Sequence, residues 1–359
     1  MDSNKENNFQ ISFLQQVAKV NKDKNILISP MSIFLALAIT ATGSEGATQS
    51  EMLKTLLQGK NLSDLEKYCK EVLDLLGKLS SVQVANAVLT KVKPEKNFVD
   101  TCKTFKALID QLVSAEQVNK WCSDKTNGKI AKIVDSVQNL EMCILNAVYF
   151  NGRWRNTFNK NSTFNLAFVK ENGEEKEVPM MGQVYDGAQF YEDEKMQMLL
   201  IPYTEQGLEA VICLPSANTK IDDFIGGLTN DYLCNALLYT ETRKVNATIP
   251  KFKIESTIEC KELLQSMGIK VAFSDGADFS KMTKETKLKI SEVTQKTYID
   301  VNEEGTEAAA VTKIGMKRCM MADPRDIPVR FLCNRPFLFM VWNHDVKDMC
   351  LFMAKIASI

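Results

Sequence analysis

The sequence predicts one domain of the α+β class, in which helices pack on β-sheets. Its 359 residues are 45% hydrophobic and 25% charged, which is the balance of a globular protein rather than of a disordered chain. No stretch rich in Pro, Gly or Ser interrupts the chain, so residues 1–359 are expected to form a single domain. Helical periodicity dominates the first half and strand-like runs dominate the second half, so both kinds of element are required.

The helical half begins with residues 9–19, whose apolar side chains recur at helical spacing. Residues 32–42 are rich in Ala and follow the break at Ser29-Pro30, which predicts a second helix. Strands are expected where β-branched and aromatic residues run between turn residues. These runs are residues 142–150, 208–214, 245–249, 298–301 and 336–341.

The charge balance and the single histidine exclude several classes of function. Lys and Arg number 44 against 45 Asp and Glu, so the formal charge of -1 gives no overall attraction to nucleic acid or to an acidic membrane. No window approaches about 18 uninterrupted apolar residues, so no membrane span is expected. His344 lies in a polar break between apolar runs and is predicted to be a turn residue. Without another histidine or a Gly-rich phosphate loop, we expect no catalytic residues, no metal site and no cofactor.

The ten cysteines indicate a reducing compartment. They are scattered, and no two have the two-residue separation typical of a zinc knuckle or a thioredoxin-type motif. We therefore expect most of them to be buried, reduced thiols. The polar N-terminus leads into no long apolar core, so no secretory signal is expected and the cytoplasm is the predicted compartment. Release from the cell by an unconventional route stays open.

Residues 301–320 combine the composition of a loop with the alternation of a strand. In an extended chain, small or apolar side chains would share one face. These residues are Thr306, Ala308, Ala310, Thr312, Ile314 and Met316. The opposite face would carry Glu307, Ala309, Val311, Lys313, Gly315 and Lys317. A short surface helix is the alternative, because Glu-Ala-Ala-Ala is good helix-forming sequence.

Part of this segment closely resembles the hinge of the reactive-centre loop of the serpin family. The matching residues are Glu303, Glu304, Gly305, Thr306, Glu307, Ala308, Ala309 and Ala310. Further motifs of the family occur in order along the chain, at residues 25–33, 46–52, 119–121, 125–130, 145–154, 250–255, 267–269 and 336–339. The chain is therefore identified as a member of the serpin family, and it resembles the intracellular, ovalbumin-like branch that includes leukocyte elastase inhibitor.

The resemblance implies a fold and a mechanism. Serpins pack helices on a large central β-sheet and two smaller sheets, and they expose a reactive-centre loop, here from about residue 303 to 328. A target serine protease cleaves this loop and is trapped as a covalent acyl-enzyme when the cut loop inserts as an extra strand into the central sheet. The native fold is then metastable and is held by a kinetic barrier. The expected partner is a serine protease, and the expected state before the reaction is a monomer.

Counting from Gly305, the spacing of the family places the reactive bond between Cys319 and Met320. This bond resembles that of a serpin that restrains elastase-like and chymotrypsin-like enzymes. Cleavage after Arg318 would instead suit a trypsin-like pocket with an acid at its base. The segment after Met320 is longer than usual in the family, which allows cleavage further along, near Arg325. Inhibition of cysteine proteases and a non-inhibitory carrier or chaperone role are the alternatives, although non-inhibitory hinges usually carry bulky, charged or proline residues.

The resemblance also assigns supporting residues. Ser29, Ser32 and Asn146 resemble the shutter, a polar cluster beneath the middle of the central sheet. Gln295 stands where the family usually has a shutter histidine, and its amide donates and accepts hydrogen bonds but cannot become charged. Trp154 resembles the aromatic residue of the breach, which is the upper opening of the sheet.

Two further features follow from the comparison with the family pattern. Lys251 and Glu303 match an ion pair that braces the hinge, which would contribute about 0 to 1 kcal/mol if it were exposed. Between residues 88 and 119 the chain is shorter than in relatives, so an edge strand of the central sheet is expected to be trimmed.

Overall fold

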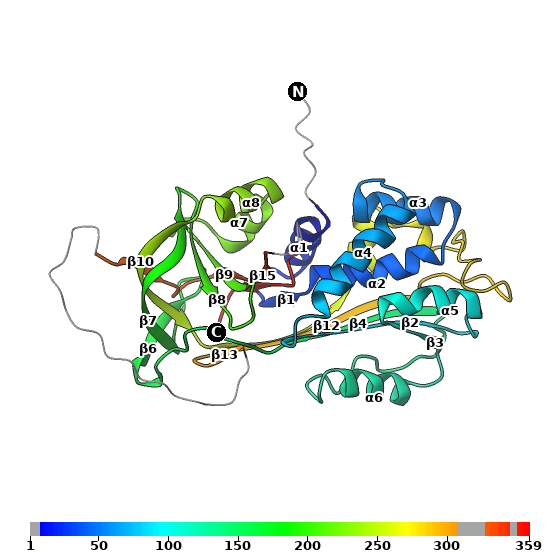
Figure 1. Cartoon of the computed structure of the whole chain (residues 1–359), viewed down its shortest axis with the longest axis horizontal. Helices are drawn as coiled ribbons and strands as arrows, with labels where there is room; N and C mark the ends of the chain where they lie inside the picture. The colour runs from blue at the N-terminus through cyan, green and yellow to red at the C-terminus, as the bar shows by residue number, and fades with distance from the viewer. Residues whose placement is uncertain (1–7, 307–326, 345–349) are drawn as a thin grey trace, which may run out of the picture.

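The computed structural model describes residues 8–306, 327–344 and 350–359 (Figure 1). Helices α1 and α2 coincide with the predicted helices at residues 9–19 and 32–42, so both predictions are confirmed. The α-helices of the described ranges are α1 (Phe9–Val20), α2 (Pro30–Thr42), α3 (Gly46–Leu57), α4 (Leu62–Leu76), α5 (Lys96–Cys102), α6 (Ala115–Lys125), α7 (Ile221–Gly226), α8 (Asn230–Leu238) and α9 (Lys261–Ser266).

Helix α2 is the buried centre of the helical layer. Pro30 occupies its first turn, where a missing N–H removes no helical hydrogen bond, and Ser29 is the N-cap residue. Every residue of α2 is buried, as expected for a helix that is apolar all round. It packs against α1, α3 and α4 and against strands of the central sheet, so Ser29 and Ser32 at its N-terminal end lie on the helix-covered face of that sheet.

The central sheet contains seven strands in the part of the chain that the structure describes. They are β2 (Val82–Thr90), β3 (Leu108–Gln111), β4 (Met142–Phe150), β5 (Gly152–Arg153), β11 (Phe252–Glu259), β12 (Glu292–Asn302) and β13 (Gly305–Thr306). Strands β4 and β13 pair with successive lengths of one edge of β12, and β11 runs along its other edge. The edge strand that was expected to be trimmed is β3, which is present but has four residues.

The second sheet contains nine strands among the described residues. They are β1 (Ile26–Ile28), β6 (Thr163–Val169), β7 (Glu175–Glu192), β8 (Met196–Pro202), β9 (Leu208–Pro215), β10 (Glu241–Pro250), β14 (Val329–Leu332), β15 (Phe337–Asn343) and β16 (Phe352–Ile356). The two smaller sheets expected from the resemblance are joined, because the 18-residue β7 pairs with β6 at its start and with β8 at its end. Four of the five predicted strand runs lie within β4, β9, β10 and β12, and the fifth, residues 336–341, begins one residue before β15.

Two hydrophobic clusters enclose the central sheet. The larger cluster joins the helical layer to inward side chains of β4, such as Ile144 and Val148. The smaller cluster lies on the outer face, where Val118 and Cys122 of α6 pack with alternate β4 residues, including Leu145. Figure 1 shows α6 on the opposite side of the sheet from α2. The strands β4 and β12 are therefore covered on both faces.

The predictions for cysteine and histidine are confirmed where the structure describes these residues. Nine cysteines lie in the described ranges without forming a disulfide, and eight of them are buried. Burial raises the pKa of the Cys69 thiol to about 12 and that of Cys102 to about 11. His344 lies in the turn after β15, with its Nε2 2.6 Å from Oε2 of Glu209. None of the helices in the described ranges has the length and apolar character needed to cross a bilayer, and these ranges hold no cluster of three candidate metal ligands.

Candidate functional site

The ladder between β4 and β12 is the central feature of the candidate site. Seven residue pairs, from Cys143 opposite Glu292 to Tyr149 opposite Tyr298, hold the two strands side by side in parallel. We call this ladder the joint. If the two strands separated, a strand running the opposite way could pair with both of them, because it would be antiparallel to each.

Directly after β12 the chain turns back at the end of the joint nearest Tyr149 and Tyr298, which we call its upper end or top. Strand β13 is antiparallel to β12, with Thr306 opposite Val301 and Gly305 opposite Asn302. Along its other edge, β13 is antiparallel to β5, which continues the line of β4. Gly305 and Thr306 therefore already lie between the two neighbouring strands.

Gly305 has no room for a side chain. A Cβ atom built on it would lie 2.2 Å from the carbonyl oxygen of Gly152 and 2.7 Å from the Cα atom of Arg153. Both contacts are with backbone atoms, which cannot move aside as the end of a side chain can. The close approach of β13 to β5 therefore requires glycine at this position.

Trp154 and Tyr203 hold the turn that leads into β13. Thr306 is fully buried, and its Oγ1 lies 2.9 Å from the hydroxyl oxygen of Tyr203. The Trp154 ring stacks on Tyr203, with centroids 4.5 Å apart and an interplanar angle of 13°. The indole N–H of Trp154 donates to Asn302 O at 2.8 Å, and its backbone N–H donates to Glu304 O at 3.1 Å. Trp154 therefore binds the turn on both sides of Glu303.

Glu303 anchors the hinge to the residue that precedes β11. Lys251 Nζ lies 3.1 and 2.9 Å from its two carboxylate oxygens, and the Thr163 hydroxyl donates to it at 2.8 Å. Burial raises the pKa of Glu303, but the hydrogen bonds from Lys251, from its own backbone and from Thr163 outweigh burial, so the pKa lies below its usual value. The Glu303 side chain is 8% exposed and that of Lys251 is 35% exposed, so the pair is better shielded than the exposed pair considered from the sequence.

A second ion pair holds the other hinge carboxylate. Lys160 Nζ lies 2.7 Å from Glu304 Oε1, and the Glu304 side chain is 12% exposed. The hydrogen bond to Glu304 raises the pKa of Lys160. The sequence does not reveal this partner, because 144 residues separate the two side chains and no local spacing connects them.

The predicted shutter residues meet across the middle of the joint. Asn146 and Gln295 are partners in the ladder, and Gln295 Nε2 donates to Asn146 Oδ1 at 2.6 Å. Gln295 also donates to Ser29 O at 2.9 Å and accepts from Ser29 N at 3.0 Å. Asn146 Nδ2 donates to Ser32 Oγ and, at 2.5 Å, to Asn86 Oδ1. We call these five residues the amide network.

The amide network is buried, and the amide donors of Asn146 and Gln295 are all used. The side-chain nitrogens of Asn146 and Gln295 each have two hydrogens, and each makes two hydrogen bonds. Asn86 is the member that the sequence analysis missed. It is the β2 partner of Asn146, and its one sequence signal is an amide between the apolar residues Ala85 and Ala87. The network therefore links three adjacent strands and the start of α2.

Several predicted site residues lie outside the described residues. They are Glu307, Ala308, Ala309, Ala310, Arg318, Cys319 and Met320, together with Arg325. Their assignments stay predictions.

Comparison with known proteins decides the family. The profile described as "Serpin (serine protease inhibitor)" matches residues 4–359. This chain belongs to the serpin family. Serpin B8 of Homo sapiens is 32% identical, over 98% of this chain and 97% of its own length, and Serpin B6 of Pongo abelii is 33% identical over the same shares.

Solved serpin structures match the fold as well as the sequence. The native state of the thermophilic serpin tengpin has a TM-score of 0.90 at 30% identity, covering 98% of this chain and 92% of tengpin. Serpin48 of the insect Tenebrio molitor has a TM-score of 0.86 at 28% identity, covering 98% of this chain and 96% of its own. The family and the fold expected from the sequence are therefore confirmed.

Gly305→Ala is expected to displace β13 from the top of the joint in this serpin. The added methyl group overlaps the backbone of Gly152 and Arg153, and relieving such a contact costs about 1–3 kcal/mol. We expect a lower midpoint of thermal unfolding. We also expect a nonspecific protease to cleave the peptide bonds that follow Glu304 faster than in wild type. Gly226→Ala is the control, because a Cβ atom there meets nothing within 4 Å. Equal melting and equal cleavage in Gly305→Ala and wild type would contradict the packing argument.

Lys251→Met is expected to destabilise the hinge at neutral pH but not in acid. The pKa of Glu303 lies below its unfolded value of about 4.3, so its contribution to stability is complete above that pH and is lost as the pH falls through the folded pKa. Without Lys251, burial raises this pKa. The difference in thermal midpoint between wild type and variant should be largest at pH 7 and shrink between about pH 5 and 3. Lys93→Met, at an exposed lysine, is the control, and a difference that does not change with pH would argue against the ion pair.

Proposed function

We propose that this serpin inhibits serine proteases as a suicide substrate. The observation that carries the proposal is the position of β13, whose two residues already occupy the top of the joint. Cleavage of the loop would free the residues after Thr306 to continue along the same path. The inserted strand would be antiparallel to both β4 and β12, which is the more stable arrangement for each pair.

The two ladders of β13 support one register for the inserted strand. Thr306 lies opposite Gly152 on one side and Val301 on the other. Each later residue would pair with the preceding residue of each neighbouring strand. Residue 312 would then lie opposite Asn146 and Gln295, which are themselves partners in the closed joint. Because the two registers agree, the strand fits without a bulge in either neighbour.

The side chains of the loop suit the inner face of this strand. Ala308, Ala310 and Thr312 would point inward, where a bulky or charged residue would be overpacked or left without a partner. Insertion would break the hydrogen bond between Gln295 and Asn146. The Thr312 hydroxyl can accept from the Gln295 amide and donate to the Asn146 carbonyl oxygen, so both groups would keep a partner.

The proposed reaction is the first half of peptide hydrolysis. The serine oxygen of the protease attacks the carbonyl carbon of Cys319, the bond to the Met320 nitrogen breaks, and the proton passes through the protease histidine to the leaving amine. An ester then joins the two proteins. Insertion would carry this ester to the far end of the joint before water hydrolyses it. We assign the targets to chymotrypsin-like or elastase-like enzymes, because Cys319 is uncharged, and cleavage after Arg318 by a trypsin-like enzyme is the alternative.

The proposal is tested by incubating the serpin with chymotrypsin-like, elastase-like, trypsin-like and papain-like proteases. Denaturing gels and mass spectrometry of the released C-terminal peptide follow. We expect a stable covalent band with a serine protease and a peptide that begins at Met320. A peptide that begins at Cys319 would move the reactive bond to Arg318 and the targets to trypsin-like enzymes. Cleavage by every enzyme without a covalent band or a gain in heat stability would reject inhibition and favour a carrier role.

Thr306→Arg is expected to convert the inhibitor into a substrate. Thr306 is fully buried beside Tyr203, so an arginine there would bring an unpaired charge into the sheet. Such a cost predicts that the covalent band falls at least about tenfold while cleavage continues. Glu307→Arg is the matched control, because the register turns residue 307 to the outer face. Undiminished trapping by Thr306→Arg would argue against the proposed path of insertion.

We also propose that this serpin acts as a monomer in the cytoplasm. The nine described cysteines form no disulfide, and thiols stay reduced in a reducing compartment. Cell fractionation followed by gel filtration tests both statements.

A further inference from the structure

The two halves of the central sheet are attached to the second sheet by different contacts. We call β11 and β12 the β12 half, and β2, β3 and β4 the β4 half. Lys251 is the single residue between β10 of the second sheet and β11. Because so short a connection leaves β11 little freedom, the second sheet is a fixed frame for the β12 half. The second sheet lies at the β13 end of the central sheet (Figure 1).

The β4 half is attached to the same frame by the turn between β8 and β9. Three successive residues of this turn each contact a different part of the central sheet. Tyr203 contacts Thr306 of β13, and the backbone N–H of Thr204 donates to Arg153 O of β5 at 2.7 Å. Glu205 binds the two residues that directly precede β2. The turn therefore crosses the top of the joint from β13 to β2.

The Glu205 carboxylate accepts four hydrogen bonds from two successive serines. Its Oε1 accepts the backbone N–H of Ser80 at 2.7 Å and the Ser80 hydroxyl at 2.5 Å. Its Oε2 accepts the N–H of Ser81 at 3.3 Å and the Ser81 hydroxyl. Ser81 is buried, and its carbonyl oxygen accepts the N–H of Asn151 at 2.8 Å, which extends the ladder between β2 and β4. Because hydrogen bonds to a carboxylate are strong, Glu205 ties both strands to the turn.

The distance between the two halves changes within three residues of this contact. Tyr149 lies directly opposite Tyr298, so the two strands are about 4.8 Å apart there. Further up, Thr306 lies between Gly152 and Val301, so these neighbours are two strand spacings apart, about 9.6 Å. The β4 half must therefore be held away from β12 at the top of the joint.

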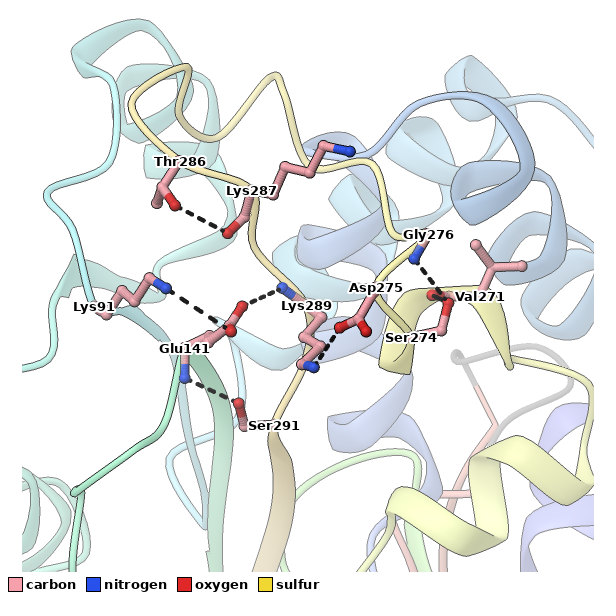
Figure 2. Close-up of polar contacts among 10 residues, drawn as sticks. All are labelled: Lys91, Glu141, Val271, Ser274, Asp275, Gly276, Thr286, Lys287, Lys289 and Ser291. Atoms are coloured by element: carbon pink, nitrogen blue, oxygen red, sulfur yellow. Dashed lines mark hydrogen bonds and ion pairs between the residues drawn. The ribbon is translucent and has the colours of Figure 1, made fainter.

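The lower end of the joint is closed by direct contacts between the two halves. The N–H of Ser291 donates to Met142 O at 2.8 Å. The N–H of Glu141 donates to the Ser291 hydroxyl oxygen at 2.9 Å (Figure 2). At the top, the spacer is β13, which has two residues and offers few hydrogen bonds to hold its neighbours apart. An outside contact that fixes the β4 half therefore helps to keep β13 in place.

We infer that Glu205 is a positioning residue that keeps room for one strand between the β4 half and β12 at the top of the joint. The site that β13 occupies is the place where an inserting strand begins. Without Glu205, the start of β2 loses its tie to the second sheet, and the β4 half is free to close on β12 and displace β13. The role in inhibition rests on the proposed function, whereas the effect on β13 in the native chain does not.

Hydrogen exchange of the native serpin tests the effect on β13 without a protease. In Glu205→Ala, the amides of Gly305 and Thr306 should exchange about three- to tenfold faster than in wild type, a part of what hydrogen bonds to a charged group contribute. The described hydrogen bonds of the Glu205 side chain reach neither residue, so a local effect would not extend to them. Unchanged exchange at these two amides would overturn the inference.

Three comparisons make this result specific. Glu205→Gln keeps the length of the side chain and one acceptor oxygen, so its exchange should lie between those of wild type and Glu205→Ala. Glu194→Ala removes an exposed carboxylate from the turn between β7 and β8 and should behave as wild type. The amides of β16, in the second sheet, should keep their wild-type rates in every variant. A rise of the same size in β16 would indicate a general loss of stability and would reject a positioning role.

The reaction with a protease that forms the covalent complex gives the second measurement. Glu205→Ala should be attacked at the wild-type rate, because Glu205 lies outside the loop. About two- to fivefold more inhibitor should be cleaved for each protease trapped, because the entrance has to reopen before the strand can insert. A ratio equal to that of wild type would contradict the role in inhibition. If wild type traps no protease, the proposed function fails, and hydrogen exchange at β13 still decides whether Glu205 positions the β4 half.

Discussion

The direct pairing of β4 with β12 is the constraint on which the other features depend. Each strand has a permanent antiparallel neighbour on its outer side, β2 for β4 and β11 for β12, whereas the two strands meet each other in parallel. Parallel partners cannot be joined by a tight turn, so the chain places them far apart in sequence. Opening of the joint, which the proposed function requires, would leave unbroken the ladders that keep each half together.

Polar groups lie at three positions along this joint, at its two ends and in its middle. The turn held by Trp154 lies at the top and the amide network lies in the middle. At the lower end, the backbone N–H of Glu141, directly before β4, donates to the Ser291 hydroxyl oxygen at 2.9 Å. A buried amide that loses its partner is costly, but one hydrogen bond can replace another of the same geometry at little net cost. Polar groups at these positions therefore hold the strands in register, and they still allow one hydrogen-bond partner to be exchanged for another.

Periodicity predicted the helices and strands because burial repeats with the pitch of each element. The family motifs predicted that Ser29, Ser32, Asn146 and Gln295 form one cluster. Asn86 and the contact between Glu141 and Ser291 were missed because they depend on the register of strands that are distant in sequence. Lys160 was missed because its contact joins a turn to a segment 144 residues away, which no local pattern encodes. The short segment between residues 88 and 119 led us to expect a trimmed edge strand, but it did not indicate that four residues would pair with β2. The union of the two smaller sheets depends on the unbroken pairing of β7, which likewise has no local signal.

In the proposed inhibition, helix α6 affects the competition between two rates, that of strand insertion and that of hydrolysis of the ester. Neighbouring strands lie about 4.8 Å apart, so a strand that enters the joint must shift one side of the sheet under α6. The helix is packed on β4, while Lys296 of β12 donates to the Lys132 carbonyl oxygen in the segment after α6, at 2.9 Å. While these contacts rearrange, water can hydrolyse the ester and free the protease. The number of inhibitor molecules consumed for each protease captured would then depend on how tightly α6 packs on the sheet as much as on the sequence of the reactive bond.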